Sequence, residues 1–341
     1  MSAYSFSRVP VKVPLVKTKN RSIQTKIPAP GTEDILIKLD NYESRSMQGT
    51  VPLVWESAYG FNVFDIKGNK WIDFTSAIFL TNIGHSNPRL LKAIRATLEK
   101  KLIHHFTYPS EIKARYYEQL VDFTEGEFDK AFLLSGGTEA TEAVLKLIRM
   151  NGQRIGKKRL GVICMEGSFH GRTLGAQLLG GIDAQKEWIG FAEPDIFHIR
   201  FPYPWVLKGD ISPEHFLINE LSRLENNGIC LETDISGVML ETFQGWGALF
   251  YPKSFVKAIE TFCKKRKVLL AMDEVQAGFG RTGSKFGYQH YDVFPDLICC
   301  GKGMGSGVAL SGVLGKREIM DIPEVGMMSS TNSANPIACA G

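Results

Sequence analysis

The sequence predicts an α/β protein built on a mostly parallel β-sheet. From residue 128 onward, short apolar runs alternate with segments of helical periodicity, and each run is continuously apolar. Alternating strands and helices are typical of β-α-β units, and continuous apolar runs are typical of strands covered on both faces. The runs are 130–134, 161–164, 237–240, 268–272, 297–300 and 312–315, and helical segments lie at 138–150 and 252–266. Ligands of such sheets bind beyond the carboxyl ends of the strands.

The N-terminal part of the chain has a different pattern. Residues 1–45 suggest an extended arm followed by a short helix, and the prolines in the arm argue against an amphipathic targeting helix. Alternating segments at 60–65 and 70–74 flank a Lys-Gly-Asn turn and predict a β-hairpin. We therefore expect an N-terminal segment over residues 1–75 and a large α/β domain over residues 76–341, with a helix at 89–101.

Composition narrows the class of protein. The 341 residues are 44% hydrophobic, enough for a sizeable core, and carry a net charge of +4 without a Lys/Arg block among aromatics, so nucleic acid is not the expected partner. No apolar run approaches the roughly 18 residues of a membrane span. Six scattered cysteines without a CxxC motif indicate reduced thiols in a cytoplasmic compartment.

A glycine-rich loop with a single lysine, Lys302, follows the apolar run 297–300. Glycines occupy positions 301, 303, 305 and 307, and glycine lets a backbone approach a flat ligand closely. A lysine at the end of a buried strand loses solvation, which lowers the pKa of its amine and makes it a nucleophile toward carbonyl groups. The alternative is a surface lysine in a flexible loop, and this stretch alone does not decide between the two.

The loop after the run 130–134 has the features of an anion site. Gly136 and Gly137 precede a predicted helix, so their backbone N–H groups would lie at its positive N-terminus, and Thr138 would add a hydroxyl donor. A phosphate fits such a site, whereas the alternative is a plain turn with an N-cap. This loop contains neither GK[ST] nor GxGxxG, which disfavours a nucleotide there.

An acid, Asp273, follows the run 268–272. A buried acid needs a cationic partner or hydrogen bonds. Asp273 therefore either pairs with an arginine such as Arg281, or holds a pyridinium nitrogen protonated so that the ring remains an electron sink.

The loop at 168–173 follows another strand. Phe169 or His170 would stack on a flat ring, and Arg172 would hold a carboxylate through two parallel hydrogen bonds. The alternative for this aromatic is an ordinary core residue. Four strand ends together thus offer a phosphate cradle, an aromatic face, an acid and a lysine, which are the parts needed to bind pyridoxal 5′-phosphate.

With these residues in place, the sequence resembles the class III aminotransferases, the ornithine/4-aminobutyrate type of pyridoxal-phosphate fold type I. The resemblance extends in order over most of residues 50–341. It rests on DEVQAGFGRTG at 273–283, which is highly specific, and on LSGGTEA at 134–140, FHGRT at 169–173, ETFQG at 241–245, GKG at 301–303, the hairpin at 60–74, and Thr331 followed by Asn335-Pro336.

The resemblance implies an aspartate-aminotransferase-like fold and a role for each matching residue. Lys302 would form the Schiff base with the cofactor and move a proton during transfer, and Asp273 would pair with the pyridine nitrogen. The other implied cofactor residues are Phe169 and Val275 against the ring faces, Gln276 at the ring 3′-oxygen, Gly136, Gly137 and Thr138 at the phosphate, His170, Glu241, and Thr331 at the phosphate of a neighbouring subunit. Arg172 and Ile78 would contact substrate, and the Thr331 assignment implies a homodimer with shared active sites.

Three departures from the family pattern bear on function. Trp246 stands where ornithine and 4-aminobutyrate enzymes often carry a glutamate that masks a second substrate-binding arginine, and an aromatic wall there suggests a bulkier or more apolar amine. Ser333-Ala334 replace the usual Gly-Gly. Family members also continue into a C-terminal small domain, so the resemblance implies that this domain is missing from the chain.

The resulting prediction is a cytoplasmic aminotransferase that moves an amino group from an ω-amino acid or amine to a 2-oxo acid by a ping-pong mechanism. An aminomutase, racemase or decarboxylase of the same family is an alternative, because the cofactor residues do not separate these reactions. A truncated, non-catalytic homologue that only binds pyridoxal phosphate is another. The amino donor depends on the shape of the pocket, which the sequence does not give.

Overall fold

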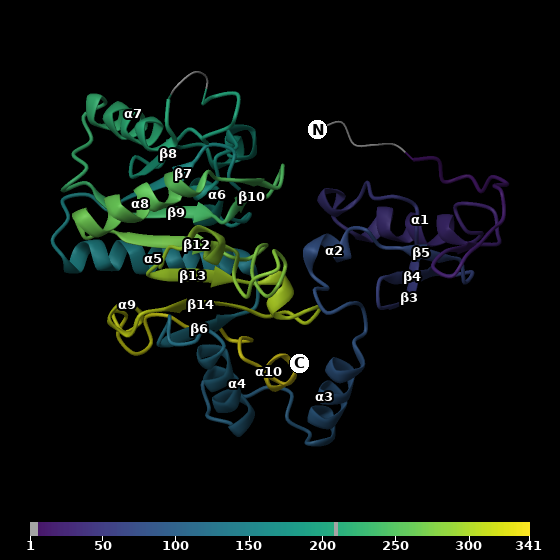
Figure 1. Cartoon of the computed structure of the whole chain (residues 1–341). Helices are drawn as coiled ribbons and strands as arrows, with labels where there is room; N and C mark the ends of the chain where they lie inside the picture. Colours follow the sequence, from purple (N-terminus) through teal and green to yellow (C-terminus); the bar gives the residue numbers. More distant parts are fainter. Residues whose placement is uncertain (1–5, 208–210) are drawn as a thin grey trace. The chain divides into compact units, whose positions relative to one another are not determined.

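The computed structural model describes residues 6–207 and 211–341. The chain divides into two compact units, Met1–Leu91 and Lys92–Gly341, which Figure 1 shows in purple to blue and in blue to yellow. The boundary expected after residue 75 falls inside the first unit. Gly60 and His85 form an antiparallel bridge, so the chain returns to the hairpin after residue 75.

The first unit contains a five-stranded antiparallel sheet in the order β1-β2-β5-β4-β3. The expected hairpin is β4 and β5, with Asn62 opposite Ile72, and the Asp65 carboxylate accepts the turn N–H groups of Lys67 and Asn69. The elements are β1 Val16–Lys17, β2 Ser22–Ile23, α1 Thr32–Tyr42, η1 Arg45–Met47, β3 Trp55–Tyr59, β4 Asn62–Asp65, β5 Lys70–Ile72 and α2 Ser76–Phe79. Helix α3, Pro88–Glu99, crosses the boundary between the units.

The second unit is organised by a seven-stranded sheet in the order β6-β14-β13-β12-β9-β7-β8. The five strands from β13 to β8 are parallel, whereas β14 is antiparallel to both of its neighbours. The strands are β6 Lys130–Leu134, β7 Gly161–Met165, β8 Ile196–Ile199, β9 Ile235–Glu241, β12 Leu269–Asp273, β13 Leu297–Cys300 and β14 Ser311–Gly315. The prediction of a mostly parallel α/β sheet is therefore confirmed.

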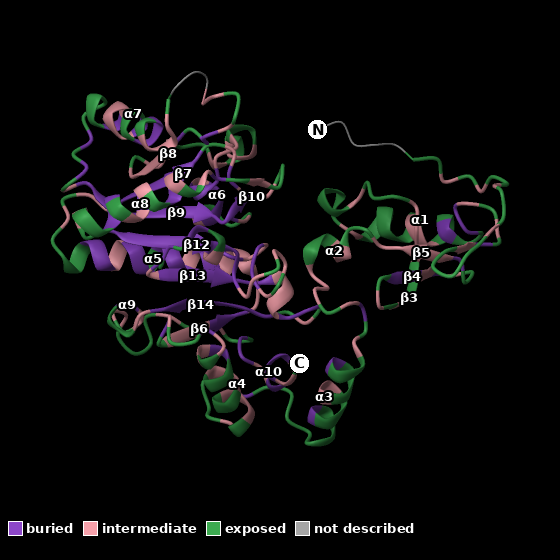
Figure 2. Ribbon diagram, viewed as in Figure 1, coloured by how far each residue is buried: buried purple, intermediate pink, exposed green. Residues whose placement is uncertain are grey.

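Helices cover both faces of this sheet. Helix α5 packs across one face together with α6 and α9, and α4, α7, α8 and α10 pack on the other. Their bounds are α4 Glu111–Asp122, α5 Gly137–Arg154, α6 Leu174–Leu179, α7 Pro213–Asn226, α8 Lys253–Arg266, α9 Arg317–Met320 and α10 Pro336–Ala340. The central strands are buried along their whole length (Figure 2), which explains why they read as continuous apolar runs.

Alternation along the strands assigns each side chain to a face. In β12, Leu269 and Ala271 pack into the core under α5, whereas Leu270 and Met272 pack into the core under α8. Because successive side chains point to opposite faces, Asp273 emerges on the α5 face. The same period places Glu241, at the end of β9, on that face as well.

Several elements were not expected from the sequence. Strand β8 is four residues long and includes His198, and helices α4 and α7 were not named among the predicted segments, although apolar residues recur in both at helical spacing. A start signal for α7 is present, since Ser212 caps the helix through the His215 N–H and Pro213 follows it. The short elements β10 Phe243–Gln244, β11 Leu249–Phe250, η2 Asp183–Gln185, η3 Glu187–Ile189, η4 Gly287–Tyr291 and η5 Lys302–Met304 complete the unit.

Three further properties concern the described part of the chain. All six cysteines are free thiols, and five of them are buried. No helix of residues 6–207 or 211–341 is long and apolar enough to cross a bilayer. Over the same residues, no cluster of His, Cys, Asp or Glu side chains is arranged to hold a metal ion.

Candidate active site

A cavity of ≈ 300 Å³ lies at the carboxyl ends of the parallel strands in the second unit. Its walls come from the loops after β6, β7, β9, β12 and β13, which are far apart in sequence and meet because parallel strands end at one edge of the sheet. The lining residues are Gly137, Thr138, Phe169, His170, Gly171, Arg172, Glu241, Phe243, Asp273, Val275, Gln276, Ala277 and Lys302.

Lys302 is partly buried in this cavity at the start of η5. Its φ of 42° lies in the left-handed region, which costs a residue with a side chain on the order of 1–3 kcal/mol and persists only where neighbours enforce it. Gly301 provides the space: an added Cβ there would lie 3.3 Å from both the Gly137 Cα and the Val275 Cγ1. Burial lowers the pKa of the Lys302 amine, and the negative charges of Asp273 and Glu241 oppose that shift.

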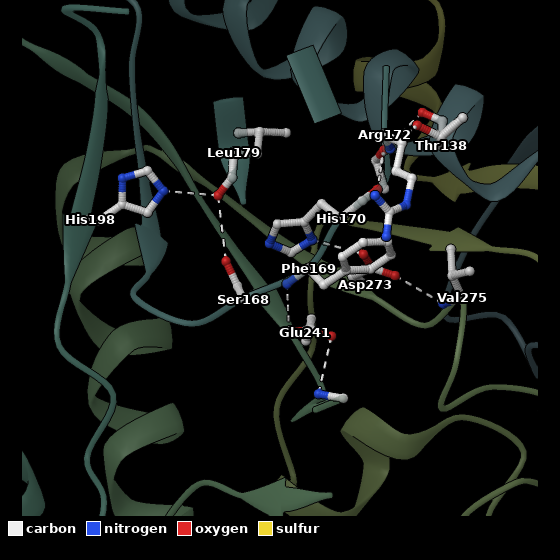
Figure 3. A network of polar contacts seen from close by, with 12 residues as sticks. Thr138, Ser168, Phe169, His170, Arg172, Leu179, His198, Glu241, Asp273 and Val275 are labelled. Carbon is white, nitrogen blue, oxygen red and sulfur yellow. Dashed lines mark hydrogen bonds and ion pairs between the residues drawn. The ribbon is translucent and has the colours of Figure 1, made fainter. Parts of the chain in front are cut away.

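Asp273 is buried at the end of β12 and has two defined partners. Its Oδ1 accepts the Val275 N–H at 3.0 Å, and its Oδ2 lies 2.8 Å from Nδ1 of the buried His170 (Figure 3). Burial by itself would lower the pKa of His170, but the hydrogen bond and charge of Asp273 raise it above its usual value. His170 Nδ1 therefore donates to Asp273, while its Nε2 is buried without a hydrogen-bond partner among the described residues.

The N-terminus of α5 opens onto the cavity at Gly137 and Thr138. Gly136 is the N-cap: its N–H donates to Glu139 Oε2 at 2.6 Å, and its carbonyl accepts the Ser311 hydroxyl at 2.8 Å. An α-helix leaves its first N–H groups without intrahelical acceptors, so the N–H groups of Gly137 and Thr138 can bind an anion. Thr138 Oγ1 accepts the N–H groups of Arg172 and of the next residue at 3.2 Å each, which ties this terminus to the loop after β7.

Phe169 and Val275 form two apolar walls of the cavity. The Arg172 guanidinium lies over the Phe169 ring, with the arginine Cζ 5.7 Å from the ring centroid. Val275 packs so closely against the start of α5 that a Cβ added at Gly137 would lie 2.8 Å from its Cγ1. A flat ring between these walls is the shape that the cavity accepts.

Glu241 joins two of the loops that build the walls. One carboxylate oxygen accepts the Phe169 N–H at 3.0 Å, and the other accepts the Gly245 N–H at 3.2 Å (Figure 3). Burial raises the pKa of Glu241 to about 7; the charge of His170 lowers it and that of Asp273 raises it further. Three titratable groups, Glu241, Asp273 and His170, are thus held together beside Lys302.

Most of the residues singled out in the sequence lie on this cavity. They are Lys302, Asp273, Gly137, Thr138, Phe169, His170, Arg172, Glu241, Val275 and Gln276. Four others do not line it. Gly136 is the helix cap, Trp246 is 52% exposed at the β10–β11 turn, Thr331 is exposed before α10, and Ile78 belongs to the first unit. The roles assigned to these residues stay predictions.

Sequence reasoning missed three lining residues, Gly171, Phe243 and Ala277. Strand alternation could have found Phe243, because it lies two positions after Glu241 and so points to the same face. Gly171 has a φ of 139°, and an added Cβ would lie 2.2 Å from Thr138 Oγ1. Its signal was a glycine in a strand-end loop, which is too common to single out.

These groups fit the expected pyridoxal phosphate. The free N–H groups at the start of α5 suit its phosphate, the two apolar walls suit its ring, and a buried carboxylate that already accepts a hydrogen bond from an N–H group suits its protonated nitrogen. The amine of Lys302 faces the same space as these groups.

Comparisons with known proteins agree with this arrangement. The model of the family "Aminotransferase class-III" matches residues 43–341. A probable 4-aminobutyrate aminotransferase of Bacillus subtilis is 31% identical over 89% of this chain and 70% of its own length. An alanine/serine racemase of Pyrococcus horikoshii is 30% identical over 98% of this chain and 72% of its own.

A solved structure shares the fold. The taurine:2-oxoglutarate aminotransferase of Bifidobacterium kashiwanohense, in complex with pyridoxal phosphate and glutamate, superimposes with a TM-score of 0.80 at 26% identity, over 91% of this chain and 71% of that one.

Replacing Gly137 with alanine tests the cradle. We expect Gly137→Ala to weaken pyridoxal phosphate binding by at least about tenfold, because its Cβ would displace Val275 from the ring wall. Gly136→Ala is the matched control, since the nearest atom to its Cβ is the flexible Glu139 carboxylate at 3.4 Å. Titration of the cofactor-free protein with pyridoxal phosphate measures both; equal affinities would contradict the proposed wall.

Proposed function

Because the chain belongs to the class III aminotransferase family, we propose that it transfers an amino group from an ω-amino acid or amine to a 2-oxo acid by a ping-pong mechanism. The protein is a pyridoxal-phosphate-dependent transaminase. One observation carries the assignment of roles: Lys302 and Asp273 line the same cavity, although they come from different strands.

Pyridoxal phosphate supplies an aldehyde and a pyridine ring that accepts electrons when its nitrogen is protonated. In the proposed site, Asp273 would pair with that nitrogen, and the hydrogen bond from His170 would hold the Asp273 carboxylate in its orientation. Phe169 and Val275 hold the two faces of the ring, with Gln276 near its oxygen. The phosphate binds the N–H groups at the start of α5, where the helix dipole favours negative charge.

Lys302 supplies the reactive amine. Burial lowers the pKa of this amine, which favours the unprotonated form that a nucleophile and a proton acceptor require. The negative charges of Asp273 and Glu241 oppose this lowering of the pKa.

Arg172 is the proposed anchor for a substrate carboxylate. Its side chain is exposed at the cavity, and within the described residues it forms no ion pair with an acidic side chain. Guanidinium and carboxylate groups match through two parallel hydrogen bonds. Trp246, at the tip of the hairpin that begins with Phe243, would add an aromatic surface for a bulky or apolar donor. The 4-aminobutyrate and taurine enzymes similar to this chain support an ω-amino donor.

Replacing Lys302 with alanine tests its proposed role as the reactive amine. We expect Lys302→Ala to lower transamination by about 10³-fold or more, because both the nucleophile and the proton carrier are lost. The variant should also lose the absorbance that borohydride reduction abolishes in the unmodified protein, together with the reductive labelling of Lys302. Lys264→Ala, at an exposed lysine on α8, is the control. Retention of the band in Lys302→Ala would reject Lys302 as the attachment point.

A second candidate is racemisation, which the similarity to an alanine/serine racemase favours. A donor screen separates the two reactions. Transamination predicts that 15N from an ω-amino acid or amine appears in glutamate or alanine when 2-oxoglutarate or pyruvate is present. If no donor transfers nitrogen to any 2-oxo acid and one enantiomer of an amino acid converts to the other, the racemase assignment replaces the transaminase.

We also propose a homodimer with shared sites, located in the cytoplasm. Thr331 is exposed in its own chain, and Tyr59, Phe74 and Ile78 are apolar side chains of the first unit that are 62%, 90% and 65% exposed. Exposed apolar side chains of this kind mark protein interfaces. The free cysteines fit a reducing compartment.

Subunit mixing tests the shared site. Lys302→Ala and Thr331→Val chains should each be impaired, but a mixed dimer would contain one site with an intact Lys302 and an intact partner Thr331. Mixing after mild dissociation should therefore raise activity above that of either variant alone, as measured by initial rate. If the mixture never exceeds the mean of its parents, each site is built from one chain.

A further inference from the structure

Glu274 is a buried acid outside the described set of cavity-lining residues. It is 0% exposed and directly follows Asp273. Its carboxylate accepts three hydrogen bonds: the Thr242 hydroxyl, the Gly287 N–H at 2.8 Å and the Tyr288 N–H at 2.8 Å. No ion pair within residues 6–207 and 211–341 involves it. All three partners donate hydrogen bonds to the carboxylate oxygens.

Glu274 lies on the opposite face of the sheet from the acidic residues that line the cavity. Strand alternation puts Glu241 and Asp273 on the α5 face, where the cavity is, and puts the residues that follow them, Thr242 and Glu274, on the α8 face. The Thr242–Glu274 hydrogen bond therefore joins the ends of β9 and β12 behind the wall.

The same carboxylate holds the loop that forms one wall of the cavity. Val275, Gln276 and Ala277 line the cavity immediately after Glu274. The loop returns at η4, where the Gly287 N–H binds Glu274 Oε2, and a Cβ added at Gly287 would lie 3.0 Å from the Cβ of Ala277. One carboxylate thus fixes both ends of the loop from 275 to 286.

Charge on the Glu274 carboxylate strengthens the hydrogen bonds that it accepts. Hydrogen bonds to an ionised acceptor are about twice as strong as those between neutral groups. Burial raises the pKa of Glu274 to about 7, and the bonds from Thr242, Gly287 and Tyr288 oppose that rise. Since burying the carboxylate costs free energy that no ion pair offsets, its three hydrogen bonds are what retain it in the fold.

We propose that Glu274 is a positioning residue for pyridoxal phosphate, holding the Val275–Ala277 wall and the end of β9 in register so that the cofactor ring fits between them. It acts through the residues beside it and does not touch the cofactor. The inference rests on the cofactor occupying this cavity, as in the proposed function.

Glu274→Gln tests the proposal, with Glu220→Gln as the matched control. Glu220 is also 0% exposed and also accepts several hydrogen bonds, from Arg200 and Arg223, but it braces α7 against β8 away from the cavity. Both variants should lower the melting temperature. Only Glu274→Gln should weaken pyridoxal phosphate binding, by roughly tenfold, and change the visible circular dichroism of the bound cofactor.

A second pair covers the case in which Glu274→Gln does not fold. Thr242→Val removes one donor to Glu274, whereas Thr242→Ser keeps the hydroxyl, so only the valine variant should lose cofactor affinity. Unchanged affinity and dichroism in Glu274→Gln, or equal losses in both Thr242 variants, would make the brace purely structural and overturn the proposal. Failure of the unmodified protein to bind pyridoxal phosphate would instead reject the proposed function.

Discussion

The active site depends on burying charged groups together at the carboxyl ends of parallel strands. Burial disfavours the ammonium form of Lys302, and the nearby carboxylates favour it, so the reactivity of the amine is set by the balance of the two effects. The His170–Asp273 hydrogen bond also stabilises a buried carboxylate, because it gives that carboxylate a hydrogen-bond donor within the fold. None of these groups would have its perturbed chemistry if it were exposed to water.

The residues that line the cavity and the residues that hold the strand ends together lie on opposite faces of the sheet. On the α5 face, Asp273 and Glu241 open into the cavity; on the α8 face, Glu274 and Thr242 tie the same strand ends together. Because neighbouring residues on a strand point to opposite faces, one short sequence such as Asp273-Glu274 can supply both a group that meets the cofactor and a group that holds its surroundings. Trp246, the proposed contact for a bulky or apolar donor, lies instead on an exposed hairpin.

Much of the fold was predictable because its signals are local. The run 130–134 coincides with β6, and the run 297–300 coincides with β13. All four residues of β13 are buried, and a strand that is covered on both faces is continuously apolar. The antiparallel direction of β14 was not predictable, because an apolar run has the same composition in either direction. The shift of the unit boundary beyond residue 75 likewise depends on a bridge between Gly60 and His85, which are distant in sequence.

The sequence by itself determined the strand ends, the glycine-rich loops and the chemical identity of the cofactor groups, because each is encoded by a short run of residues. Only the tertiary structure decided which of them share a cavity, that His170 binds Asp273 rather than standing free beside the ring, that Gly136 caps a helix, and that Glu274 braces the wall from behind. The physical reason is that hydrogen bonds and burial bring together residues that can lie more than a hundred positions apart in the sequence. No local pattern specifies such pairs.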